Sequence, residues 1–313
     1  MSTVPAPPTR SRVWHPGRPV DVLATWGTLR RGAGDPAWLV SGGVLWRALA
    51  TPLGAVTLRV GVDARHERVV ARAWGPAESV DRLLDALPRM LGADDDPAGF
   101  EPRHPVLERA LRLHPGWRVP ATGLVLEAMV PAVIEQKVTG QEAFGGQRRL
   151  VRKHGTPAPG PGAGLGLVAP PGADRLRSVA SWEWLQLGVS PQRADTVMRV
   201  VHLADRLEEL PQLTRAAARR RMTAVAGVGV WTAAETAQRA LGDPDAVSFG
   251  DYHVARNIGW ALTGVEVDDT GLAELLDPYR GHRYRVQRLL ELVGVRRPRR
   301  GPRMAPRHHL PTR

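Results

Sequence analysis

Two glycines separated by one apolar residue, Gly227-Val228-Gly229, stand between two segments with the hydrophobic spacing of helices. Because glycine lacks a Cβ atom, such a turn can adopt positive φ angles and point backbone N–H groups outward at the start of the next helix. A phosphate group can bind to these N–H groups without help from a side chain. For Gly-X-Gly alone, a glycine that merely ends a helix is the simpler interpretation. The surrounding residues must therefore decide between a phosphate-binding turn and a simple helix end.

A lone carboxylate, Asp251, follows the next predicted helix and stands at the start of another. Aspartate at a helix start most often caps the helix by accepting backbone N–H groups. A carboxylate can also stabilise the cationic sugar that develops when an N-glycosidic bond breaks, and it can orient the attacking water. Taken alone, Asp251 would be interpreted as a helix cap. The preceding glycine hairpin makes it the predicted catalytic residue, and one side chain can serve both purposes.

The segment 222–233, which holds the glycine turn and Trp231-Thr232-Ala233, and the later Gly250-Asp251-Tyr252 together resemble a known family pattern. That pattern is the helix-hairpin-helix, glycine- and proline-rich loop and catalytic aspartate of a DNA glycosylase superfamily. Within it, the sequence looks most like the DNA-3-methyladenine glycosylase II type. Weaker similarity to the family's DNA-wedging segment and helix junctions lies at 113–120, 132–139, 187–194 and 278–284. The resemblance extends over residues 15–295.

This resemblance implies a monofunctional DNA glycosylase of base excision repair that acts on double-stranded DNA. It would hydrolyse the N-glycosidic bond of a flipped alkylated purine of the 3-methyladenine type and leave an abasic site. Asp251 would stabilise the sugar cation, and an alkylated base that is already cationic leaves without a strong general acid. Superfamily members that also cut the strand carry a Schiff-base lysine where this sequence has Trp231. No strand cleavage (AP-lyase activity) is therefore expected.

Trp231 and Tyr252 are predicted to line the base pocket, where their ring faces would attract a cationic purine. The alternative for each is an aromatic residue of the core. Glu235, one helical turn after Trp231, stands where relatives carry an aromatic residue, and it would either contact the base or face solvent. The residues predicted to bind DNA are Gln136, Lys137, Gly227, Val228, Gly229 and Thr232.

The sequence departs from the family pattern at three positions. Glu235 and Leu290 replace aromatic residues of the pocket, and Lys137 stands where an apolar wedge residue usually fills the gap left by the flipped base. Because two pocket aromatics are absent, a glycosylase that acts on deaminated or oxidised bases is an alternative. A second alternative is a non-catalytic helix-hairpin-helix protein that binds DNA or senses lesions, in which Asp251 would only repel phosphate.

The composition favours a polyanionic partner, since the formal net charge is +12. Seven arginines and no acidic residue lie between Val295 and Arg313, so part of this charge belongs to a basic tail, 296–313, that is predicted to be disordered. The absence of cysteine excludes disulfides, zinc–thiolate sites and an iron–sulfur cluster. No organic cofactor is expected. The resemblance allows a monovalent cation at the hairpin carbonyls, but no side chain is assigned as a metal ligand.

The predicted fold class is α+β. Apolar and β-branched runs at 44–50, 55–62 and 68–74 predict an antiparallel sheet, and 79–91 has helical spacing. These elements form an N-terminal domain, 15–100, before an all-α helix-hairpin-helix glycosylase domain, 101–295. Within the second domain, 155–174 is predicted to be a surface loop, and Glu135 to lie on a solvated helix face. No apolar run could span a membrane, so a cytoplasmic monomer that associates with the nucleoid through DNA is expected.

Overall fold

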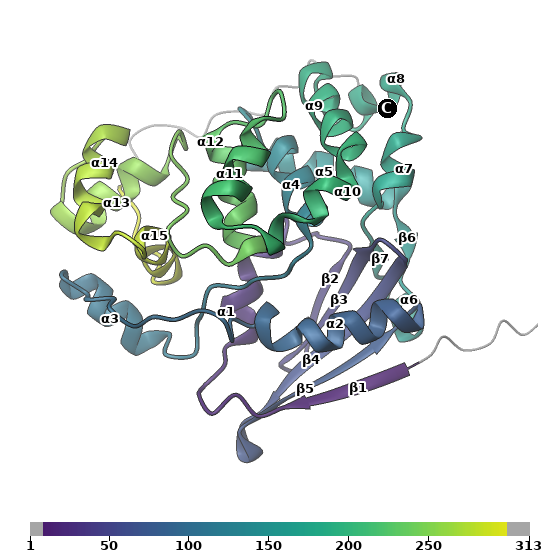
Figure 1. The fold of residues 1–313 in the computed structure, drawn as a ribbon, viewed down its shortest axis with the longest axis horizontal. Coiled ribbons are helices and arrows are strands. Elements are labelled where there is room, and N and C mark those ends of the chain that lie inside the picture. Colours follow the sequence, from purple (N-terminus) through teal and green to yellow (C-terminus); the bar gives the residue numbers. More distant parts are fainter. Residues whose placement is uncertain (1–8, 299–313) are drawn as a thin grey trace, which may run out of the picture.

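A computed structural model of the protein describes residues 9–298 and places a five-stranded antiparallel sheet at the N-terminal side (Figure 1). The strand order is β1-β5-β4-β3-β2. The strands are β1 (Thr9–Trp14), β2 (Trp38–Ser41), β3 (Val44–Thr51), β4 (Gly54–Asp63) and β5 (Arg68–Trp74). The three predicted strands correspond to β3, β4 and β5. The sheet begins at Thr9, before the predicted domain start at residue 15.

Helix α2 (Ala77–Met90) covers one face of the sheet. Alternate residues of the central strand β4, Val56, Leu58 and Val60, are almost fully buried against apolar positions of α2. The apolar face of β4, formed by every second residue, thus packs against the apolar face of α2. Each face removes the other from water. The predicted combination of sheet and helix is confirmed.

The rest of the described chain is mainly helical, as predicted, and the α+β fold class is confirmed. The longer helices are α3 (Pro105–Leu113), α4 (Val125–Ile134), α5 (Gly140–His154), α9 (Pro191–His202), α11 (Arg215–Thr223), α12 (Val230–Thr236), α13 (Val254–Thr263), α14 (Asp269–Leu276) and α15 (Arg283–Leu292). Shorter helices are α7 (Ala173–Arg177), α8 (Ser181–Gln186) and α10 (Ala204–Glu208). Helix α12 continues into a π-helical turn, η4 (Ala237–Leu241).

Helix α4 is the centre of the helical part. It is apolar except for Glu127, which pairs with Arg47, and this is the pattern of a buried helix. It packs against α9 and α12, and this cluster forms one hydrophobic core. A second core joins α3, α13, α14 and α15. The loop that carries Asp251 lies between η4 of the first cluster and α13 of the second, so the two cores together position it.

The prediction of a surface loop at 155–174 is wrong. This segment forms a small ribbon of β6 (Thr156–Pro157) and β7 (Val168–Ala169) around the short helix α6 (Pro161–Gly164). Ala158, Leu167 and Ala169 are buried in a cluster with residues of the N-terminal sheet. Glycine and proline here allow close backbone packing against the sheet, which composition alone does not distinguish from an exposed loop.

The N-terminal segment also reaches the helical part directly. Helix α1 (Val22–Trp26) and the 3-10 turn η1 (Gly27–Leu29) lie between the sheet and the helices (Figure 1). The indole N–H of the fully buried Trp26 donates to the carbonyl of Met90 at 2.6 Å, which fixes α1 against the end of α2. In the described part of the chain, no helix is both long and apolar enough to cross a membrane.

Candidate active site

The hairpin between α11 and α12 is formed by residues 224–229, as the sequence predicts. Gly227 has a φ of +93°, and a Cβ atom built on it would lie 2.3 Å from Oγ1 of Thr196 on α9. Glycine is therefore required there for both conformation and space. Gly229 starts α12 with an extended backbone and has open space around it. Both glycines are exposed, whereas the side chain of Val228 is buried in the core below them.

Asp251 lies beside the hairpin helix and accepts three hydrogen bonds. Its Oδ1 accepts the backbone N–H groups of His253 at 2.7 Å and Val254 at 3.1 Å, and these bonds cap α13. Its Oδ2 accepts the indole N–H of Trp231 at 3.1 Å. The carboxylate is partly exposed. One oxygen thus serves as the predicted helix cap, while the other is aimed toward the hairpin helix.

Tyr252 is 66% exposed and does not belong to the core. The guanidinium of Arg256 lies over its ring, with Cζ 4.3 Å from the ring centroid. Trp231 is partly buried at the start of α12. The structure therefore places two aromatic side chains next to Asp251, one bonded to the carboxylate and one adjacent to it in the chain.

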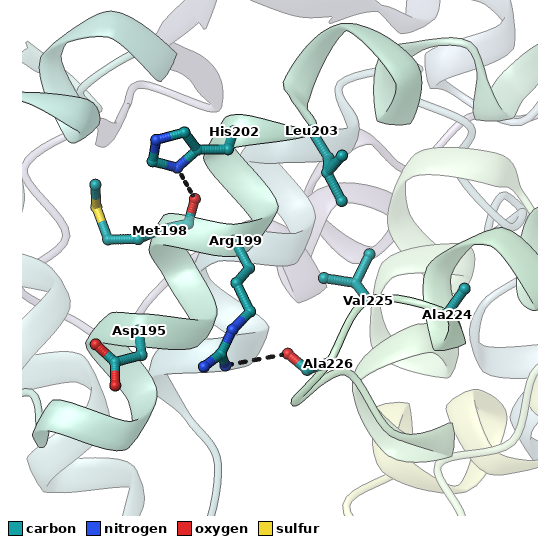
Figure 2. Close-up of a pocket in the computed structure, with 8 residues that line it drawn as sticks. All are labelled: Asp195, Met198, Arg199, His202, Leu203, Ala224, Val225 and Ala226. Carbon is teal, nitrogen blue, oxygen red and sulfur yellow. Dashed lines mark hydrogen bonds between the residues drawn. The ribbon is translucent and has the colours of Figure 1, made fainter.

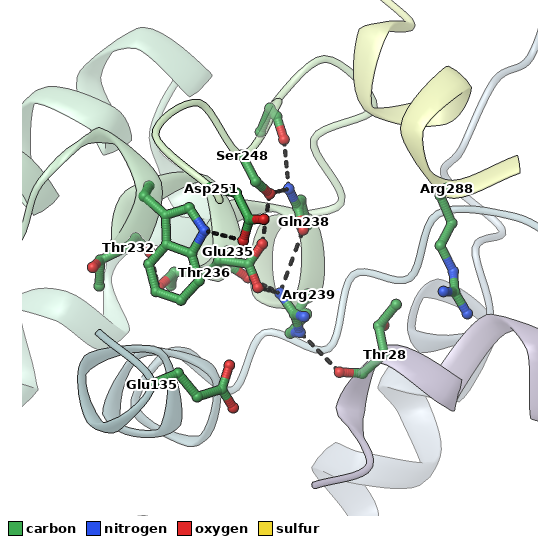
Figure 3. Close-up of polar contacts among 12 residues, drawn as sticks. Thr28, Glu135, Thr232, Glu235, Thr236, Gln238, Arg239, Ser248, Asp251 and Arg288 are labelled. Carbon is green, nitrogen blue, oxygen red and sulfur yellow. Dashed lines mark hydrogen bonds and ion pairs between the residues drawn. The ribbon is translucent and has the colours of Figure 1, made fainter. Parts of the chain in front are cut away.

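Glu235 does not face solvent, because only 8% of the residue is exposed. Figure 3 shows its side chain among polar partners. Its Oε1 accepts the hydroxyl of Ser248 at 2.6 Å, and its Oε2 lies 2.8 Å from Nη1 of Arg239. Gln238 donates its amide to Ser248 as well, at 2.8 Å. A hydrogen-bonded polar network thus lies one helical turn beyond Trp231, where the resemblance implies an aromatic residue.

Gln136 and Lys137 form the turn after α4, which ends at Ile134. The side-chain amide of Gln136 donates to the carbonyl of Gly227 at 2.9 Å and to Oγ1 of Thr232 at 2.8 Å. Lys137 is exposed and has a φ of +54°, a left-handed conformation that is rare for lysine. Thr232 is buried, so its hydroxyl bonds Gln136 beneath the surface. The turn and the hairpin are therefore held together.

The prediction of a solvated Glu135 is wrong. Its Oε1 lies 2.8 Å from Nη1 of Arg31, and the two side chains are 17% and 8% exposed. Burial raises the pKa of Glu135, and the attraction of Arg31 opposes that shift. Arg31 was not among the predicted site residues, because nothing in the local sequence shows that the loop after η1 reaches α4.

Arg239 joins the N-terminal segment to the hairpin helix. Its Nε donates to the carbonyl of Thr28 at 2.9 Å, and its Nη1 contacts Glu235. Burial by itself lowers the pKa of Arg239, but the attraction of Glu235 and other groups outweighs it, and the pKa is raised. Arg239 therefore stays charged in a buried position.

An open groove of about 520 Å³ runs between α9 and the hairpin (Figure 2). Its lining residues are Asp195, Met198, Arg199, His202, Leu203, Ala224, Val225 and Ala226. Arg199 donates to the carbonyl of Ala226 at 3.4 Å. The hairpin carbonyls of Ala226 and Gly227 accept hydrogen bonds from Arg199 and Gln136, respectively. Among residues 9–298, no group of three or more His, Asp or Glu side chains could hold a metal ion.

Comparison with curated proteins finds relatives in Mycobacterium tuberculosis described as a probable bifunctional transcriptional activator/DNA repair enzyme AlkA. The match is 33% identical over 178 residues, and it covers 54% of this chain and 33% of the relative. The chain thus spans about a third of the length of the curated relatives it matches. No family model matches the chain.

Comparison with solved structures shows the DNA glycosylase fold. The 3-methyladenine DNA-glycosylase from Archaeoglobus fulgidus superposes with a TM-score of 0.73 at 18% identity, covering 90% of this chain and 97% of that one. The apo 8-oxoguanine glycosylase/lyase of Clostridium acetobutylicum gives a TM-score of 0.67 at 13% identity, covering 92% and 98%. The resemblance to DNA glycosylases predicted from the sequence is therefore confirmed for the fold.

Proposed function

We propose that this protein is a monofunctional DNA glycosylase that removes a flipped, alkylated purine from double-stranded DNA and leaves an abasic site. The observation that carries this proposal is the hydrogen bond between Trp231 and Asp251. It joins the hairpin that would bind DNA to a carboxylate that could stabilise a cationic sugar. The glycosylase fold and the similarity to a probable DNA repair enzyme support the same conclusion.

In the proposed reaction, Asp251 acts through its charge. As the N-glycosidic bond lengthens, positive charge develops on the deoxyribose, and a carboxylate fixed nearby stabilises it. The three hydrogen bonds to Asp251 fix the orientation of its carboxylate before substrate arrives. The bonding electrons leave with the base, and water attacks the anomeric carbon, with its proton passing to solvent or to the carboxylate. A cationic base becomes neutral on leaving.

Release of the base without strand cleavage follows from Trp231. An indole ring has no amine that could attack the sugar and form a Schiff base. The indole instead donates its N–H to Asp251. In this proposal Trp231, with the exposed Tyr252, forms an aromatic border to the base site. Such rings attract a cationic purine more strongly than a neutral one.

DNA would bind across the hairpin and the turn after α4. The exposed backbone at Gly227 and Gly229 suits a phosphate group, and the N-terminus of α12 favours negative charge. Lys137 would project toward the gap left by the flipped base, while Gln136 keeps its turn against the hairpin. The proposed arrangement is a monomer acting on DNA at the nucleoid in the cytoplasm. Its N-terminal domain runs from Thr9, where β1 begins, to residue 100, and its helical domain covers 101–295. The basic tail, 296–313, lies outside the described residues from 299 onward.

A second candidate substrate class is favoured by Glu235. Its buried network with Ser248 and Arg239 offers hydrogen-bonding groups where an aromatic wall would suit an alkylated base. Deaminated or oxidised bases differ from normal ones in their donors and acceptors, and such differences are read by polar groups. This candidate retains Asp251 as the catalytic residue.

The test is base release from a panel of duplexes that contain alkylated, deaminated or oxidised bases. Strand scission is scored with and without alkali, because alkali cleaves at an abasic site. The proposal expects release of alkylated purines, with scission only after alkali. Release confined to oxidised or deaminated bases would support the second candidate. Tight binding without release from any duplex would instead indicate a non-catalytic DNA-binding protein.

A further inference from the structure

One buried ion pair and one hydrogen bond connect the segment after α1 to the helices that carry the site. Arg31 contacts Glu135 at the end of α4, with 2.8 Å between Nη1 and Oε1. Arg239 contacts Glu235 on α12, and it also donates to the backbone of Thr28 in the N-terminal segment. The same segment thus touches both the helix before the DNA-facing turn and the helix after the hairpin.

Arg31 is anchored on its own side of this contact. Its backbone N–H donates to Oδ2 of Asp35 at 2.8 Å, and the residue is 8% exposed. Neither Arg31 nor Glu135 can recover full hydration in place if the other is removed. Breaking a buried pair leaves an uncompensated charge, which is far more unfavourable than breaking an exposed one. The pair therefore fixes Glu135 relative to the N-terminal domain.

Glu135 immediately precedes the turn that would enter DNA. Gln136 is tied to the hairpin through Gly227 and Thr232, and Lys137 follows with its left-handed backbone. A non-glycine residue keeps such a conformation only where its surroundings hold it. The contact of Glu135 with Arg31 holds the N-terminal side of the turn, and the contacts of Gln136 connect it to the hairpin.

We propose that Arg31 is a positioning residue for the DNA-entering turn: through Glu135 it holds Lys137 in the conformation that fills the gap left by a flipped base. This inference rests on the proposed function, because only a base-flipping protein needs the gap filled. Arg31 itself is buried behind the turn and is not expected to touch DNA.

The test compares the affinity of Arg31→Met and wild-type protein for two duplexes, one with a tetrahydrofuran abasic-site analogue and one undamaged. Fluorescence anisotropy measures binding without requiring bond cleavage. Arg31→Met should weaken binding to the abasic-site duplex about tenfold and leave binding to the undamaged duplex unchanged, because phosphate contacts do not need the turn. Arg31→Lys, which retains the charge, should recover most of the preference.

The control is Arg10→Met, because Arg10 pairs with Asp81 at 2.9 Å on the exposed surface of the N-terminal domain. It should bind both duplexes like wild type. If Arg31→Met does not fold, Glu135→Gln carries the same comparison. If Arg31→Met keeps the wild-type preference for the abasic-site duplex, or loses affinity equally for both duplexes, the role of Arg31 is refuted. The proposed function would stand in either case. A wild type that binds both duplexes equally would overturn the proposed function and the inference with it.

Discussion

The indole nitrogen of Trp231 donates a hydrogen bond to Oδ2 of Asp251 at 3.1 Å, although the two residues are 20 positions apart in the sequence. Asp251 also caps α13 through Oδ1, so its carboxylate has little freedom to rotate. The functional and structural interpretations of Asp251 thus apply to different oxygen atoms of the same group. Trp231 links the hairpin directly to the proposed catalytic residue.

Trp231→Phe keeps an aromatic ring but removes the donor to Asp251. Hydrogen bonds to charged groups contribute about 1.5–3 kcal/mol, so the single-turnover rate of base release should fall roughly ten- to hundredfold. Trp182→Phe, at an exposed tryptophan on α8, is the control and should leave the rate unchanged. An unchanged rate in Trp231→Phe would show that the indole N–H is not needed to orient Asp251.

Borohydride trapping distinguishes hydrolysis from Schiff-base chemistry. The chain contains only two lysines, Lys137 and Lys153. Incubation with substrate duplex and borohydride should give no covalent protein–DNA complex, because no amine occupies the hairpin position held by Trp231. A trapped complex would contradict the monofunctional proposal, and its loss in Lys137→Arg or Lys153→Arg would identify the amine.

The two hairpin glycines should respond differently to alanine. Gly227→Ala places a Cβ against Thr196 at a positive φ, and we expect a loss of about 1–3 kcal/mol in the free energy of unfolding. Gly229→Ala meets no atom within 4 Å and has an ordinary φ, so its stability should stay close to that of wild type. Denaturant unfolding of both variants measures the difference. Equal stability losses would contradict the geometry described for the turn.

Glu208 provides a test of buried charge near α4. Its carboxylate accepts the backbone N–H groups of Val125 and Leu126, but burial dominates and raises its pKa. A raised folded-state pKa gives a stabilising contribution that is present at low pH and lost as pH rises through that pKa.

Glu208→Gln should therefore remove part of the pH dependence of the free energy of unfolding. As the pH is lowered from neutral, wild type should gain stability relative to the variant. Denaturant unfolding at several pH values measures this. Glu209→Gln, at an exposed neighbouring side chain, should show a smaller change. A wild-type advantage that grows with rising pH would show that the carboxylate is stabilised by its N–H partners more than burial disfavours it.

The sequence was sufficient to predict elements whose periodicity is local. Strands β3, β4 and β5, the amphipathic helix α2 and the hairpin at Gly227 follow from apolar spacing and glycine chemistry. Strand β1 was missed because its sequence, from Thr9 to Trp14, is mostly polar and lies at a sheet edge. Pairing with β5 decides its conformation, and pairing cannot be inferred from one strand alone.

The polar contacts behind the site depend on positions far apart in the chain. Glu135 has the sequence surroundings of a surface glutamate, and only the packing of the N-terminal loop brings Arg31 to it. Glu235 likewise obtains its environment from Ser248 and Arg239. The sequence predicts a site at Asp251 and the hairpin because a family pattern joins them, whereas the buried charge partners belong to no such pattern.

The most direct test of the proposed function is single-turnover base release from a duplex containing 3-methyladenine, with wild type and Asp251→Asn compared at saturating enzyme. Asparagine retains a cap oxygen for α13 but removes the negative charge. Release should slow by about two to three orders of magnitude, with duplex affinity and thermal stability close to wild type. Base release by Asp251→Asn at the wild-type rate would contradict the assignment of Asp251 as the residue that stabilises the sugar cation.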